Sequence, residues 1–290
     1  MLALNGGRRV VPAQVLVLGA AFSVQAGAAV AKSLLPTLGP AGVVFLRLAF
    51  GSLALWAIGR PRLSERTRRE LWLVAALGVT LVSMNLLFYE ALERLPLGVA
   101  VTVEFVGPLA VAVLGSRRLL DGVWIALAAL GIALLADGGG GSVHITGLLF
   151  AVLAGVCWGL YIILGTRVGR VFPGSTGLAP AMAIGALLAL PWGVLSAGHH
   201  LRDPQLVGAG VGVGLLCSAL PWSLELEAMR RLPTQVFGVL MSLEPAVAAL
   251  SGFVLLGEHL RVRAWVALVF VVIASAGASR RHGREVPLNA

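Results

Sequence analysis

The chain has 290 residues, of which 58% are hydrophobic and only 12% are charged. A soluble domain averages about 25% charged residues, so this composition excludes an ordinary water-soluble globule and favours a protein that a bilayer solvates. A net charge of +9 would suggest a nucleic-acid partner in a soluble protein, but here the basic residues lie between apolar segments, and we expect no nucleic-acid partner.

Apolar segments of about 17–25 residues are long enough to cross a bilayer as helices. Prolines and a glycine run at 138–141 fall between these segments, where connections are needed. The sequence therefore predicts an all-α membrane protein with ten transmembrane helices. We place them near residues 12–31, 40–59, 70–90, 96–115, 119–137, 145–166, 175–196, 205–224, 233–256 and 262–279.

The distribution of basic residues predicts the orientation of these helices. With the N-terminus in the cytoplasm, sixteen basic residues fall on the cytoplasmic side and five on the outer side. Because cytoplasmic segments carry the excess of Lys and Arg, both termini are expected in the cytoplasm. The sixteen are Arg8, Arg9, Arg60, Arg62, Arg66, Arg68, Arg69, Arg117, Arg118, Arg167, Arg170, Arg230, Arg231, Arg280, Arg281 and Arg284; the five are Lys32, Arg94, Arg202, Arg261 and Arg263.

A short motif occurs twice. Residues 90–96 read Glu-Ala-Leu-Glu-Arg-Leu-Pro and are followed by Pro108, while residues 227–233 read Glu-Ala-Met-Arg-Arg-Leu-Pro and are followed by Pro245. The offset is constant, because 227 − 90, 233 − 96 and 245 − 108 all equal 137. Two copies with five spans each must enter the bilayer in opposite senses. We therefore expect two inverted five-helix repeats, at 1–140 and 141–290, as in many secondary transporters.

Arg47 and Glu104 are ionisable residues at comparable depth within two predicted helices. A charge at the bilayer centre costs about 2.5–3.5 kcal/mol, so such residues usually line a pathway. One interpretation is a static ion pair that fixes the packing of the helices. The other is a binding site in which Arg47 meets a substrate carboxylate and Glu104 meets an ammonium group or a proton.

Glu244 directly precedes Pro245, and Glu104 lies four residues before Pro108. Proline removes a helix hydrogen bond, so each repeat is expected to place a carboxylate beside a helix break, where transporter sites occur. Because Glu244 lacks a basic partner in its own helix, we expect it to carry the coupling proton. The alternative is a carboxylate bonded to a neighbouring helix.

Other polar and aromatic residues within the helices are weaker candidates. They could face a cavity, although each alone is more often a packing residue. These are Gln25, Ser83, Asn85, Trp158 and Tyr161. Glycines four residues apart, as in Gly155 with Gly159, Gly208 with Gly212 and Gly210 with Gly214, predict close helix contacts.

Enzymes, pumps and metal proteins are disfavoured. The chain has no Gly-Lys-Ser/Thr phosphate loop and none of the metalloprotease or serine-hydrolase motifs, so we expect neither an ATP-driven pump nor an enzyme. Cys157 and Cys217 fall in apolar segments without metal-ligand spacing, and the polar loop with His199, His200 and Asp203 offers too few ligands for zinc. No metal or cofactor is expected.

Several longer stretches carry a resemblance to a known family. Residues 104–112 with 116–118, residues 218–225 and residues 231–246, together with the duplicated Arg-Leu-Pro element, resemble the EamA type of the drug/metabolite transporter superfamily. The resemblance implies a multi-pass protein of the bacterial inner membrane that exports small amino acids of the threonine/homoserine class in exchange for protons. Export of another metabolite or a drug in the same fold is the alternative.

Overall fold

The computed structural model describes residues 11–61, 63–64, 66–114, 119–136, 144–172, 176–229, 231–232 and 234–282. All regular elements in these ranges are helices. They are α1 (Ala13–Ile58), α2 (Arg68–Leu92), α3 (Leu97–Glu104), α4 (Val106–Leu114), α5 (Leu119–Ala136), α6 (Ile145–Val171), α7 (Leu178–Ala197), the 3₁₀ turn η1 (Gly198–Arg202), α8 (Pro204–Gly214), the π-helical η2 (Leu215–Ala219), α9 (Leu220–Met229), α10 (Thr234–Met241), α11 (Glu244–Leu256) and α12 (Val262–His282).

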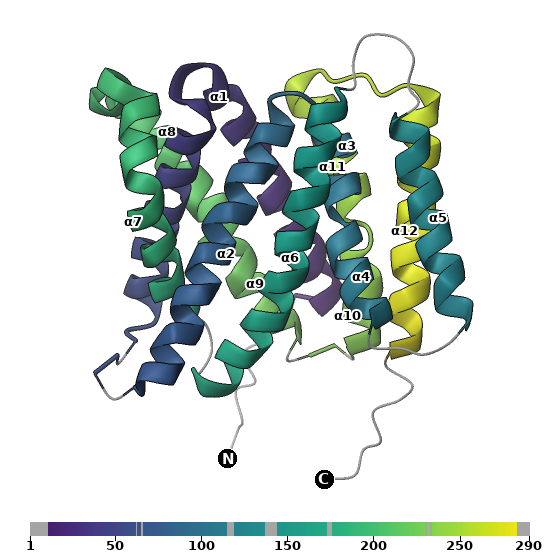
Figure 1. Ribbon diagram of the computed structural model, residues 1–290, viewed down its shortest axis with the longest axis horizontal. Coiled ribbons are helices and arrows are strands. Elements are labelled where there is room, and N and C mark those ends of the chain that lie inside the picture. Colours follow the sequence, from purple (N-terminus) through teal and green to yellow (C-terminus); the bar gives the residue numbers. More distant parts are fainter. Residues whose placement is uncertain are drawn as a thin grey trace, which may run out of the picture.

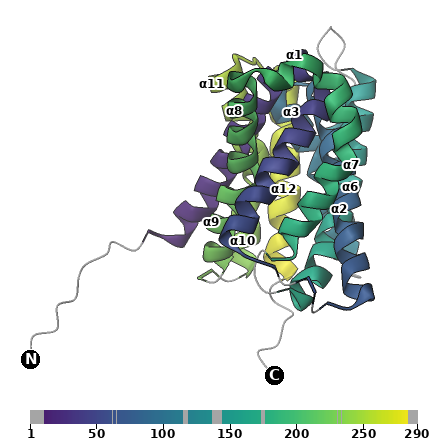
Figure 2. The same ribbon diagram turned by 90° about the vertical axis from the view of Figure 1, so that its left-hand side faces the viewer.

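The helices run along one common direction and form a single bundle (Figures 1 and 2). Helix α1 packs against α7, α8 and α9 in one part of the bundle, while α5 pairs with α12 at the other end. The start of α1 and the end of α12 both lie at the lower end of Figure 1. Two segments distant in sequence are thereby brought to the same end of the molecule.

Six helical stretches in the described part of the chain are long and apolar enough to cross a membrane. They cover 13–58, 68–92, 145–171, 178–202, 204–229 and 236–256, and two shorter apolar helices cover 97–111 and 262–277. Large apolar side chains such as Trp72, Leu195 and Val262 are more than two-thirds exposed on the outside of the bundle. An apolar exterior over long helices identifies the chain as a membrane protein.

The connection predicted between residues 31 and 40 is a kink within α1. Helical structure continues through Pro36, and the direction changes at Gly39, whose φ of 67° lies in the left-handed region that glycine tolerates best. The Ser196 hydroxyl donates to Leu38 O at 2.8 Å and ties the kink to α7. The predicted loop was therefore too long, because the chain changes direction at the single residue Gly39.

The two copies of the duplicated motif precede half-helices with matching bounds. Helices α3 and α10 begin and end at equivalent positions, since 97 + 137 is 234 and 104 + 137 is 241. Pro108 and Pro245 lack the N–H that would bond to the carbonyl four residues earlier, on Glu104 and Met241. Each half-helix ends at that residue, so the predicted helix breaks are confirmed. The glycine run at 138–141 lies outside the described residues.

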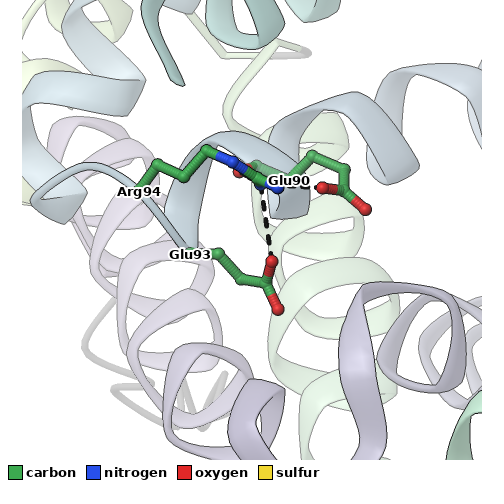
Figure 3. A network of polar contacts seen from close by, with 3 residues as sticks. All are labelled: Glu90, Glu93 and Arg94. Atoms are coloured by element: carbon green, nitrogen blue, oxygen red, sulfur yellow. Dashed lines mark hydrogen bonds and ion pairs between the residues drawn. The ribbon is translucent and has the colours of Figure 1, made fainter. Parts of the chain in front are cut away.

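Each copy of the motif also forms an ion pair between side chains four residues apart. Arg94 Nη1 lies 2.7 Å from Glu90 Oε2 and 3.4 Å from Glu93 Oε2 at the end of α2 (Figure 3). Arg231 pairs with Glu227 in the same way in the second copy. Burial raises the pKa of Glu93, and the neighbouring Glu90 adds to the rise while Arg94 opposes it.

A second polar cluster joins the two halves of the sequence. Lys32 Nζ lies 2.6 Å from Glu258 Oε1 and also donates to Leu95 O, while Glu258 Oε2 accepts a 2.7 Å bond from Leu97 N. The Glu258 carboxylate therefore caps the N-terminus of α3 from the connection between α11 and α12. This contact holds the start of α3 against the connection between α11 and α12.

Candidate functional site

A cavity of about 200 Å³ lies inside the bundle, between α1, α2, α3, α6, α7, η2, α9, α10 and α11. All seven residues singled out from the sequence as candidate site residues line it. They are Gln25, Arg47, Asn85, Glu104, Trp158, Tyr161 and Glu244. Ser83, which was a weaker candidate, is not part of this lining.

Among the described residues that line this cavity, Arg47 is the one with a positively charged side chain. Its Nη1 donates to the Tyr89 hydroxyl at 3.2 Å and its Nη2 to Cys217 O at 3.4 Å, while its Nε is buried without a partner. The guanidinium also lies 5.8 Å from the centre of the Tyr89 ring. These contacts hold the arginine in place from α2 and η2.

The direct ion pair between Arg47 and Glu104, which was one reading of the sequence, is absent among the described contacts. The bonds of Arg47 go to a tyrosine hydroxyl and a backbone carbonyl instead. The positions of the two residues along their predicted helices indicated a similar depth. They did not determine the distance between the two side chains. Both charges face the same cavity, so they can contact one ligand.

Gln25 and Glu244 are joined by a hydrogen bond between their side chains in the cavity. Gln25 Nε2 donates to Glu244 Oε1 at 3.4 Å, and both side chains are more than nine-tenths buried. The remaining oxygen of each group, Gln25 Oε1 and Glu244 Oε2, has no hydrogen-bond partner. Buried polar atoms are normally satisfied, so two free oxygens at one cavity indicate a place for a donor.

Glu104 is positioned by the break between α3 and α4. It is the last residue of α3, and the following Phe105 packs edge-on against Trp158 with ring centres 5.2 Å apart. Helix α6 approaches closely here, because a Cβ atom at Gly155 would lie 2.6 Å from Glu104 O. The break thus places a carboxylate and an aromatic wall at the same side of the cavity.

The other candidates have individual partners. The Asn85 amide donates to Leu81 O at 2.8 Å, within its own helix. Tyr161 is hydrogen-bonded to Trp222, which also lines the cavity. Both residues therefore shape the site from α2 and α6.

The sequence reading missed one face of the eighth predicted helix. Cys217, Ser218, Pro221, Trp222 and Glu225 all line the cavity. Their spacing of three to four residues marks one face of a helix, which is the signal that could have identified them. The bulge η2 lies within this helix, and such π-helical turns are frequent at functional sites.

The predicted glycine contacts are confirmed in part. A Cβ atom at Gly107 would lie 1.9 Å from Gly155 O, and one at Gly210 would lie 2.7 Å from Leu46. Gly208 and Gly212 have no neighbouring atom within 4 Å of such a Cβ, so that pair does not mediate packing. Small residues occur on two faces of α8, but only the face with Gly210 and Gly214 packs against α1.

The cavity presents one guanidinium and the three carboxyl groups of Glu104, Glu225 and Glu244. A zwitterion has a carboxylate that can bind the guanidinium and an ammonium group that can bind the carboxyl groups. Ligand sites for drug-sized molecules occupy about 300–1,000 Å³, so a cavity of about 200 Å³ suits a smaller solute.

Comparison with known proteins identifies the family. The family model described as "EamA-like transporter family" matches the chain twice, at residues 11–136 and 145–280. The chain belongs to the EamA-like transporter family. Its membership confirms the resemblance seen in the sequence, and it makes this EamA-like protein a membrane transporter and not an enzyme.

Individual relatives agree with this family. The threonine/homoserine exporter RhtA of Escherichia coli K12 is 43% identical over 273 residues, which cover 93% of this chain and 92% of that protein. RhtA of Salmonella typhimurium LT2 is 42% identical over 265 residues, covering 91% and 90%. A solved crystal structure with 21% identity has a similar fold, with a TM-score of 0.60 over 96% of this chain and 99% of that one.

Proposed function

We propose that this protein is a secondary active exporter of small amino acids of the threonine/homoserine class. The observation that carries the proposal is the small buried cavity that presents a guanidinium and several carboxyl groups together. The identity of 43% to the threonine/homoserine exporter RhtA over nearly the full length of both chains supports this substrate class.

In this proposal Arg47 binds the carboxylate of the amino acid, and Glu104 faces its ammonium group. The buried Arg47 Nε without a partner supports the first assignment, since an arginine fork binds a carboxylate with two bonds. Trp158, Tyr161 and Asn85 enclose the apolar part of the solute. Burial between charges of both signs would exclude solutes that carry only one charge.

The architecture we propose has ten transmembrane helices in two inverted repeats, at residues 1–140 and 141–290. The two family matches, at 11–136 and 145–280, and the identical offset of α3 and α10 support the division. The excess of basic residues on one side supports cytoplasmic termini in a bacterial inner membrane. The start of α1 and the end of α12 at the same end of the bundle agree with an even number of crossings.

Protons are the proposed coupling ion, with Glu244 as the carrier. A carboxyl group beside a helix break at mid-membrane depth is a common proton site in transporters. Glu244 begins α11 next to Pro245, and among the described residues its side chain is bonded by the neutral amide of Gln25. An exporter can then use the inward proton gradient to move amino acids outward.

Exchange in proteoliposomes tests the substrate class. Purified protein is reconstituted with internal threonine, and the entry of labelled threonine, homoserine, leucine, glutamate and lysine is compared with empty liposomes. We expect exchange with threonine and homoserine and little with the charged or larger amino acids. Exchange with none of the amino acids would refute the proposal and favour another metabolite or a drug as substrate.

A further inference from the structure

The pair formed by Gln25 and Glu244 is incomplete in a particular way. One bond joins them, from Gln25 Nε2 to Glu244 Oε1 at 3.4 Å, and the second oxygen of each group is buried without a partner. Gln25 is 2% exposed and Glu244 is 6% exposed, so both groups are shielded from bulk solvent. The two free atoms belong to the same amide and carboxyl groups that already meet.

The charge state of Glu244 determines whether the amide oxygen of Gln25 is a free acceptor. An ionised carboxylate only accepts hydrogen bonds, so the NH₂ end of Gln25 must face it, and the amide oxygen is left as a free acceptor. A proton on Glu244 Oε2 would turn that atom into a donor. Its acceptor would be Gln25 Oε1, and the amide and the acid would then be joined by two bonds.

We propose that Gln25 Oε1 is the specificity-determining acceptor for the side-chain hydroxyl of the transported amino acid, and that this hydroxyl and the Glu244 proton use it alternately. The inference rests on the proposed export of hydroxylated amino acids. It assigns a selectivity role to Gln25 and a direct competition between substrate and proton. Such competition is what an antiporter requires, since the two ligands must not occupy the site together.

The other charged groups around Glu244 are less suited than Gln25 to accept a hydrogen bond from the substrate hydroxyl. The titratable and charged residues that line the cavity together with Glu244 are Arg47 on α1, Glu104 on α3, Tyr161 on α6, Cys217 on η2 and Glu225 on α9. From α12, Ser275 bonds Ser242 at 3.1 Å, just before α11. Arg47 presents only donors, and Glu104 is assigned to the ammonium group in the proposed function. The neutral acceptor in the pair is the Gln25 amide oxygen, which suits a neutral hydroxyl donor.

The inference predicts how well the site distinguishes threonine from valine. The two amino acids have the same shape, but valine carries a methyl group in place of the hydroxyl and leaves Gln25 Oε1 unpaired. An unpaired buried polar atom weakens binding by about tenfold or more. Acidic pH should reduce this preference for threonine, because a proton on Glu244 would occupy Gln25 Oε1.

Binding to detergent-purified protein tests the inference. The affinities for threonine and valine are measured at acidic and at neutral pH for the wild type and for Gln25→Met, which keeps the length of the side chain without its polar atoms. Gln205→Met is the matched control, because Gln205 is exposed on α8 away from the cavity. Glu244→Gln, whose amide donates as the protonated acid would, is the second variant.

We expect the wild type to bind threonine about tenfold more tightly than valine at neutral pH, with a smaller ratio at acidic pH. In Gln25→Met the ratio should fall close to one and lose its pH dependence, while valine binding persists. Glu244→Gln should show a low ratio at both pH values. The Gln205→Met control should behave as the wild type does.

Unchanged selectivity in Gln25→Met would overturn the inference. If that variant does not fold, the wild type still decides, because equal affinity for threonine and valine, or a ratio independent of pH, contradicts the inference while amino-acid binding stands. A wild type that binds neither threonine nor homoserine would refute the proposed function itself. The two failures are therefore distinguishable.

Discussion

At the residue scale, buried polar atoms without partners gather in the cavity. Gln25 Oε1, Arg47 Nε and Glu244 Oε2 are all buried and unpaired, and all three residues line the same cavity. Leaving such an atom unpaired costs about 1–3 kcal/mol, so this arrangement is unfavourable for an empty protein. A ligand that satisfies several of these atoms recovers that cost on binding.

Replacing Arg47 by methionine should weaken transport much more than folding. Methionine replaces the aliphatic part of the arginine side chain but removes the only described cation of the cavity lining. Loss of a charged hydrogen bond costs about 1.5–3 kcal/mol, which corresponds to about 10- to 150-fold weaker apparent affinity for the amino acid. Labelled threonine exchange in proteoliposomes measures the change, with membrane abundance determined in parallel.

Tyr89→Phe is a matched comparison for Arg47→Met. It removes one bond to the guanidinium, at 3.2 Å, but leaves the charge and the aromatic ring, so a smaller loss of exchange is expected. If abundance of Arg47→Met fell in parallel with its activity, Arg47 would be a packing residue and its assignment to the substrate carboxylate would be wrong.

Glu244→Gln should separate exchange from coupling. The glutamine cannot carry a proton, so stimulation of threonine transport by a pH gradient should disappear, while exchange at equal pH and saturating threonine should stay within about threefold of the wild type. Glu70→Gln, at a half-buried position in the first turn of α2 outside the cavity lining, is the control and should retain stimulation. Persistent pH stimulation in Glu244→Gln would show that another group carries the proton.

At the element scale, broken helices position the acids. Helix α3 ends at Glu104 and α11 begins at Glu244, so both carboxylates stand where a proline prevents a backbone hydrogen bond. The first break is supported by α6, whose backbone at Gly155 lies against Gly107 and Glu104. The short half-helices are held by packing and capping more than by their own length.

Gly107→Ala should therefore reduce folding. The added methyl group would lie 1.9 Å from Gly155 O, a backbone atom that cannot move without shifting α6. Overpacking of this kind costs about 1–3 kcal/mol or more, so we expect several-fold lower membrane abundance and a lower thermal unfolding midpoint. Gly212→Ala, with no atom within 4 Å of the added Cβ, should be neutral. Equal tolerance of both substitutions would contradict the described contact.

At the scale of the whole molecule, the sequence predicted more of the site than of its internal contacts. The cost of buried charge, and the presence of polar and aromatic residues within predicted helices, led to seven residues that line one cavity. The partners of Arg47 and the participation of Glu225 were not predicted, because helical spacing defines the faces of a helix but not its rotation against its neighbours. The kink at Gly39 was also missed, since a proline such as Pro36 often ends a helix but does not always do so.

The proposed orientation makes a prediction for the complete bundle. If both termini are cytoplasmic, alkaline phosphatase fused after the C-terminus should be inactive, because that enzyme matures only in the periplasm. A fusion placed in the connection between α7 and α8, near Arg202, should be active. An active C-terminal fusion would reverse the orientation that the basic residues indicate.

The central claim is that this cavity exports small hydroxylated amino acids at the expense of a proton gradient. Inverted membrane vesicles test it most directly, because export then appears as uptake of labelled threonine into the vesicle lumen. We predict that an acidic lumen stimulates threonine uptake and that homoserine inhibits it. Dissipation of the proton gradient should reduce uptake to the level seen without a pH difference. Threonine uptake no greater than in vesicles without the protein would contradict the account.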